Sequence, residues 1–62
     1  MSKNMPTTKE VELIADLLLL EESLCKKAKL YSNITMNTKL KEQLETLSQN
    51  HKERFMALYS LL

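Results

Sequence analysis

Apolar residues recur with the period of an α-helix in two segments of this chain, which a short polar stretch separates. At about 100° per residue, small and apolar residues of the first segment share one face: Ile14, Leu17, Leu18, Leu24, Cys25, Ala28 and Tyr31. The corresponding face of the second segment collects Leu40, Leu44, Leu47, Phe55, Leu58 and Leu62. The pattern therefore predicts two amphipathic helices.

Capping residues mark the ends of both predicted helices. Thr7 and Glu10 have the spacing of a capping box, which places a loose tail over residues 1–6 and a helix start near residue 8. Asn33 can take the left-handed conformation that ends a helix where Gly is missing, and Asn37 is a favourable N-cap. We expect a helix over about 8–32, a turn at 33–37 and a second helix over about 38–62, so that 7–62 forms one hairpin.

The short turn predicts that the two helices are antiparallel neighbours. A chain of 62 residues buries only about 60% of its unfolded surface, and its leucines are too many for one partner helix to cover. Two hairpins packed face to face would bury both stripes, so the expected fold is all-α, an antiparallel two-helix hairpin that dimerises into a four-helix bundle. The residues expected in the core or dimer interface are Ile14, Leu17, Leu18, Leu24, Ala28, Leu40, Leu44, Leu47, Phe55 and Leu58.

Charge and composition exclude several classes of function. Nine Lys and Arg against eight Asp and Glu leave a net charge of +1, and three aromatic residues offer little stacking, so a nucleic-acid partner is not expected. The longest apolar run, Leu17–Leu20, is far shorter than the roughly 20 residues of a membrane span. The single Cys25 cannot form an intrachain disulfide. With no signal peptide expected either, we expect an intracellular location.

Glu21 and His51 stand at the centres of the two apolar stripes, where Leu would be usual. At a rise of 1.5 Å per residue, both lie roughly 20–24 Å from the middle of the predicted turn. They are therefore expected at the same level on facing surfaces. Because a buried carboxylate without a partner is strongly unfavourable, each group needs a partner, and the candidates are the other residue or a metal ion.

Two interpretations of this pair remain open. A structural Glu21–His51 hydrogen bond or ion pair could fix the register of the helices. Alternatively, ferritin-like bundles bind two metal ions with one Glu from one helix and Glu-x-x-His from its neighbour, twice over. Here Ser48 stands three residues before His51, so a symmetric dimer would supply two carboxylates and two imidazoles, enough for one zinc or iron ion. No cofactor is otherwise expected.

The chain resembles the spore coat protein F-like family, small ferritin-like helical proteins of endospore-forming Firmicutes. The resemblance spans about residues 8–62, and rests on the run from Leu20 to Ala28 with Tyr31, on Asn37 to Lys41, on Gln49-Asn50-His51, and on Phe55, Leu58 and Leu62. It implies a ferritin-like four-helix arrangement, an association with the spore coat or its proteins, and ferritin-type ligand places for Glu21 and His51. Ser48 departs from rubrerythrin-type relatives, which have Glu there, and this puts oxidase and iron-storage chemistry in doubt.

These observations favour a non-enzymatic structural or assembly protein that is associated with the spore coat and works as a homodimeric helical bundle. One alternative is a degenerate ferritin-like protein that binds metal through Glu21 and His51. Another is a helical adaptor that binds a partner helix through its apolar stripe. Small helical aspartyl-phosphate phosphatases have a Ser-Gln-Glu-Leu-Asp motif on their second helix. The comparable stretch here, from Ser48 to Lys52, shares only the first two residues of that motif. No hydrolytic, phosphoryl-transfer or redox constellation is complete in the sequence.

Overall fold

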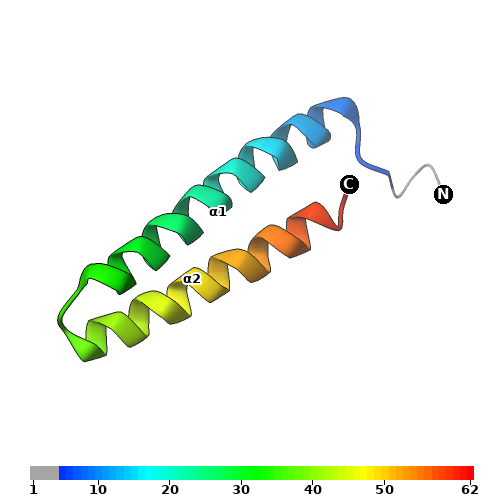
Figure 1. Cartoon of the computed structure of the whole chain (residues 1–62). Coiled ribbons are helices and arrows are strands. Elements are labelled where there is room, and N and C mark those ends of the chain that lie inside the picture. Colours follow the sequence, from blue (N-terminus) through cyan, green and yellow to red (C-terminus); the bar gives the residue numbers. More distant parts are fainter. Residues whose placement is uncertain (1–4) are drawn as a thin grey trace.

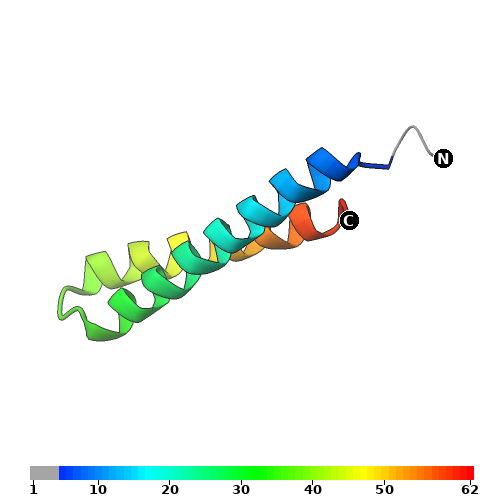
Figure 2. The same cartoon turned by 90° about the horizontal axis from the view of Figure 1, so that it is seen from above.

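A computed structural model describes residues 5–62 of the chain, and over this range it contains two helices and no strand. Helix α1 spans Thr8–Ile34 and helix α2 spans Thr38–Tyr59. The two helices run antiparallel and side by side, so that the described start of the chain and the C-terminus lie at the same end (Figures 1 and 2). The predicted all-helical hairpin is confirmed. Residues 1–4 of the predicted tail lie outside the described part.

Helix α1 begins with the capping box that the sequence predicts. The Thr7 hydroxyl accepts a hydrogen bond from the Glu10 backbone N–H at 3.1 Å, and the Glu10 carboxylate accepts one from the Thr7 N–H at 2.8 Å. At the start of α2, the Asn37 side chain accepts from the Leu40 N–H at 2.9 Å. Each cap satisfies backbone donors that no helical carbonyl can reach.

The far ends of the helices differ from the expectation. Asn33 does not end α1 in a left-handed conformation, since no residue other than Gly has a positive φ within the described range. The helix continues past residue 32 to Ile34, and the extended Thr35 closes it with an N–H bond of 3.0 Å to the Tyr31 carbonyl. Helix α2 ends at Tyr59, and Leu61 and Leu62 close it with shorter-range bonds to the carbonyls of Leu58 and Tyr59.

The helices meet along one row of residues from each, which we call the seam. Positions in this row alternate in spacing between four and three, as in coiled-coil packing. Its members are Ile14, Leu18, Glu21, Cys25, Ala28 and Ser32 of α1, and Leu44, Ser48, His51, Phe55 and Leu58 of α2. All of them are buried or half-buried, while almost every other position on the two helices is exposed.

The seam changes character along its length. Near the turn α2 contributes Leu44, but α1 contributes only small side chains, Ala28 and the fully buried Ser32, whose hydroxyl donates to the Lys29 carbonyl at 2.7 Å. At the open end it contains Ile14, Leu18, Phe55 and Leu58. Between these halves lie polar residues, and they form the candidate site. The single hairpin therefore has a thin core that is interrupted in the middle.

Six of the ten residues expected in the core or dimer interface belong to the seam: Ile14, Leu18, Ala28, Leu44, Phe55 and Leu58. The other four remain exposed on the single chain, with Leu17 at 38%, Leu24 at 37%, Leu40 at 42% and Leu47 at 43%. They lie beside the seam on one side of it, where one partner helix cannot reach them. They belong to the surface described below.

Candidate functional site

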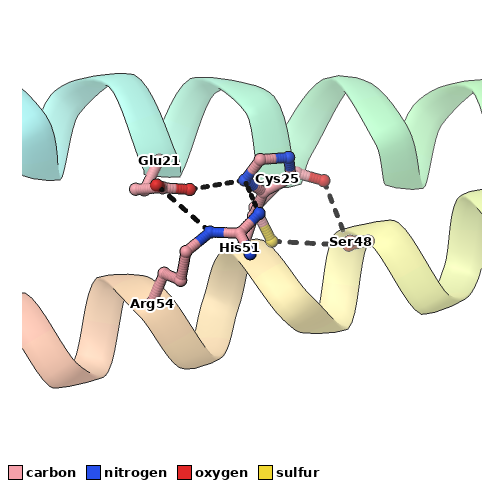
Figure 3. A network of polar contacts seen from close by, with 5 residues as sticks. All are labelled: Glu21, Cys25, Ser48, His51 and Arg54. Atoms are coloured by element: carbon pink, nitrogen blue, oxygen red, sulfur yellow. Dashed lines mark hydrogen bonds and ion pairs between the residues drawn. The ribbon is translucent and has the colours of Figure 1, made fainter.

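A layer of polar side chains crosses the middle of the seam. Glu21 projects from α1 toward His51 of α2, and a His51 Nδ1 contact with Glu21 Oε1 joins the two helices (Figure 3). Their side chains are 16% and 11% exposed. The two residues that the numbering places at the same level are thus in direct contact.

Arg54 belongs to this layer, although it was not among the candidate residues from the sequence. Its Nε lies 3.4 Å from Glu21 Oε2, and its Nη2 lies 3.1 Å from His51 Nδ1. An ionised carboxylate can only accept, so His51 Nδ1 carries the proton and donates it to Glu21. Arg54 cannot then donate to the same nitrogen, and its attractive contact is the one with Glu21.

These contacts change the acidity of Glu21. The hydrogen bond from His51 lowers the pKa of the Glu21 carboxyl, and the positive charge of Arg54 acts in the same direction. Desolvation in the seam opposes this shift, but it is the smaller influence, and the pKa lies below the ordinary value of 4.5. Glu21 is therefore ionised at neutral pH, with a partner for each of its oxygens.

A second polar contact lies next to this layer, on the side toward the turn. The Ser48 hydroxyl donates to the Cys25 carbonyl at 3.1 Å, and the Cys25 thiol lies 3.4 Å from the Ser48 oxygen (Figure 3). Since the hydroxyl proton is used in the first bond, the thiol is the donor in the second. The Ser48 hydroxyl thus donates one hydrogen bond and accepts another inside the seam. This explains how a polar residue can be buried there with only 8% of its surface exposed.

The residues present do not fit a ferritin-type metal site. Both oxygens of Glu21 are engaged, and the Arg54 guanidinium at 3.4 Å places a positive charge where a cation would bind. Ser48, in the place of the missing carboxylate, is bonded to Cys25. Within residues 5–62, no three His, Cys, Asp or Glu side chains are grouped so that they could hold an ion.

A row of exposed apolar side chains covers one face of the hairpin, and we call it the leucine face. Its members are Leu13, Leu17, Leu20, Leu24 and Tyr31 of α1, Leu40 and Leu47 of α2, and Leu61 just beyond the end of α2. These residues are between 37% and 60% exposed, and the 100° helical period places them on the same side of the seam. Arg54 lies within this face, since positions 40, 47, 54 and 61 are seven residues apart.

The opposite face is different. Near the turn it carries Lys26, Lys29, Glu45 and Lys52 around a shallow hollow of about 530 Å³. Lys26 also forms an exposed ion pair of 3.8 Å with Glu22, a contact of little energetic weight. Charged side chains are thus concentrated on this face near the turn, whereas toward the open end it has a shallow apolar hollow of about 370 Å³ beside Leu19 and Tyr59.

Comparison of the chain with protein-family models, with curated proteins and with solved structures gives no match. Neither helix within residues 5–62 combines the length and the apolar character that are needed to cross a membrane.

Proposed function

We propose that the protein is a non-enzymatic assembly protein whose working form is a homodimer. In this dimer two hairpins pack their leucine faces together and complete a four-helix bundle. The observation that carries the proposal is the leucine face itself, because leucines such as Leu20 and Leu47 are 54% and 43% exposed on the single chain. Contiguous apolar surface of this kind is typical of a protein interface.

The dimensions of the hairpin support this proposal. Its radius of gyration is 14.9 Å, whereas a compact chain of this length would have one of about 11 Å. Its accessible surface is 5155 Å², about 1,000 Å² more than the roughly 4,100 Å² of a compact protein of this mass. A standard interface buries about 800 Å² per partner, so one face-to-face contact would remove an excess of this size.

The resemblance to spore coat protein F-like proteins supports a place for the dimer in the spore coat, with other coat proteins as further partners. It also supports a ferritin-like arrangement of the four helices. The leucine face is equally suited in its chemistry to a partner helix from another protein, and this adaptor function is the second candidate. The two candidates differ in what the isolated protein does.

The test is the mass of the isolated protein in solution. Sedimentation equilibrium at micromolar concentration should give twice the chain mass of 7.2 kDa, with a helical circular dichroism spectrum. A folded, helical monomer would contradict the homodimer and favour the adaptor. An unfolded monomer would contradict both, because the chain would then lack a stable fold of its own.

We also propose that the protein has no catalytic turnover. Glu21 is engaged by His51 and Arg54, and Ser48 stands in the place of a second carboxylate, which supports this proposal against ferroxidase chemistry. Ferrous iron should oxidise at the same rate with and without the protein. Oxidation that is faster with the protein and slows again in Glu21→Ala would contradict the proposal.

A further inference from the structure

Arg54 is the one charged residue in an otherwise apolar row of the leucine face. Positions 40, 47 and 61 of this row are Leu, and the Arg54 side chain is 53% exposed. Beside it is a shallow hollow of about 500 Å³, lined by Leu17, Glu21, Arg54, Ala57, Leu58 and Leu61. A partner that covers the leucine face must therefore also cover the Glu21–Arg54 ion pair.

The contacts across the seam locate this ion pair along the hairpin. Glu21 lies level with His51, and Cys25 lies level with Ser48. By the same register Leu47 lies within two residues of the level of Leu24. The leucine face extends by similar lengths on either side of the Glu21–His51 layer, since its outermost residues are Leu13 and Leu61 at the open end and Tyr31 and Leu40 near the turn. The charges therefore lie at the centre of the face.

Two identical hairpins can pack these faces together about a two-fold axis in only two ways. If the turns lie at the same end, α1 of each copy packs on α2 of the other. If the turns lie at opposite ends, α1 packs on α1 and α2 packs on α2. Both arrangements are all-antiparallel bundles, and the leucines fill the interface in each.

The charges distinguish the two arrangements. With the turns at the same end, Arg54 of each copy lies over α1 of the other, at the height of the partner's Glu21, and positive and negative groups alternate around the axis. With the turns at opposite ends, Glu21 meets the partner's Glu21 and Arg54 meets the partner's Arg54. Like charges across an interface disfavour an arrangement, and alternating charges favour it.

We propose that two copies pair with their turns at the same end, and that Arg54 selects this orientation by lying between its own Glu21 and the partner's Glu21. This inference rests on the proposed homodimer and names the residue that orients it. The leucines supply the attraction in both arrangements, and Arg54 supplies the preference. In this dimer each Glu21 lies between two guanidinium groups, its own Arg54 and that of the partner copy.

Distances between spin labels on the two copies test the orientation. The label is placed at the turn by Met36→Cys, where the side chain is 98% exposed, in a Cys25→Ser background. A second variant, Lys9→Cys, labels the open end. With the turns at the same end, both label pairs should be separated by less than about 25 Å, since neighbouring helix axes lie about 8–10 Å apart. With the turns at opposite ends, each pair should be separated by about 40 Å, given a rise of 1.5 Å per residue.

The same measurement is repeated with Arg54→Leu and, as a matched control, with Lys52→Leu, which removes a cation from the opposite face of α2. Arg54→Leu should give a mixture of short and long distances, whereas Lys52→Leu should keep the short one. A dimer with only the long distance would overturn the orientation and leave the proposed homodimer intact. A single short distance in Arg54→Leu would overturn the role of Arg54, and a monomer by sedimentation would overturn the homodimer and the inference together.

Discussion

Truncation of Leu24 should weaken the dimer by an amount that follows from its exposure. Leu24 is 37% exposed on the single chain, so this fraction of the side chain is what a partner would bury. Full burial of a Leu side chain stabilises by about 1.5–3 kcal/mol, and each dimer contains two copies of the residue. Leu24→Ala should therefore cost about 1–2 kcal/mol of association free energy, which raises the dimer dissociation constant roughly tenfold.

Leu30→Ala is the matched control for this change. Leu30 is on the same helix and is 56% exposed, but it lies outside the leucine face, next to the hollow lined by Lys26 and Lys29. Sedimentation equilibrium over a concentration series gives the dissociation constant of each variant, and circular dichroism shows whether the helix content is unchanged. If the two variants shift the dissociation constant equally, the leucine face is not the interface, and the reasoning from exposure fails.

Three further predictions concern the seam and the caps. Glu21→Leu or His51→Leu alone should lower the melting temperature, because each leaves the other polar residue buried without its partner. The double variant should regain much of this loss. Single variants that melt like the wild type would show that the pair does not contribute to stability. The pKa of Glu21 is lowered in the folded state, so its contribution to stability is complete above about pH 4.5 and is lost as the pH falls below that value; urea titrations from pH 3 to pH 7 should show a shallower loss in Glu21→Gln, and equal slopes would refute this. Thr7→Ala removes the N-cap hydroxyl of α1 and should cost about 1 kcal/mol in urea unfolding, whereas Thr8→Ala, one residue further on, should cost less.

The arrangement of the helices could be predicted because its signals are local. The capping box of Thr7 and Glu10 and the side chain of Asn37 act within three residues, and the helical period needs only the sequence. That Glu21 and His51 lie at the same height along the hairpin followed from the rise per residue. The end of α1 was less predictable, since Thr35 could end the helix in an extended conformation without any left-handed residue.

The parts of the site that the sequence did not predict are those that depend on the reach of a side chain. Arg54 lies beside the apolar stripe of the second helix, at a position where a charged side chain is usually solvated. Its long side chain nevertheless brings the guanidinium to Glu21. Its place in a row with Leu40, Leu47 and Leu61 was the available signal. The burial of Ser48 could not be predicted for another reason. A hydroxyl that donates to a carbonyl of the facing helix can be buried at little cost, and the sequence does not show that bond.

The uneven filling of the seam has a consequence for how the hairpin forms. The covalent link lies beside its small side chains, Ala28 and Ser32, whereas the bulky contacts at the level of Ile14 and Leu58 lie at the far end. If the helices pair first near the turn, the chain gains little apolar contact, while it loses the conformational freedom of every residue that becomes ordered. Most of the apolar contact forms when the half of the seam with Leu18 and Phe55 meets, at large separations in sequence. Partly formed hairpins are therefore poorly populated, and this small chain should fold in a two-state transition.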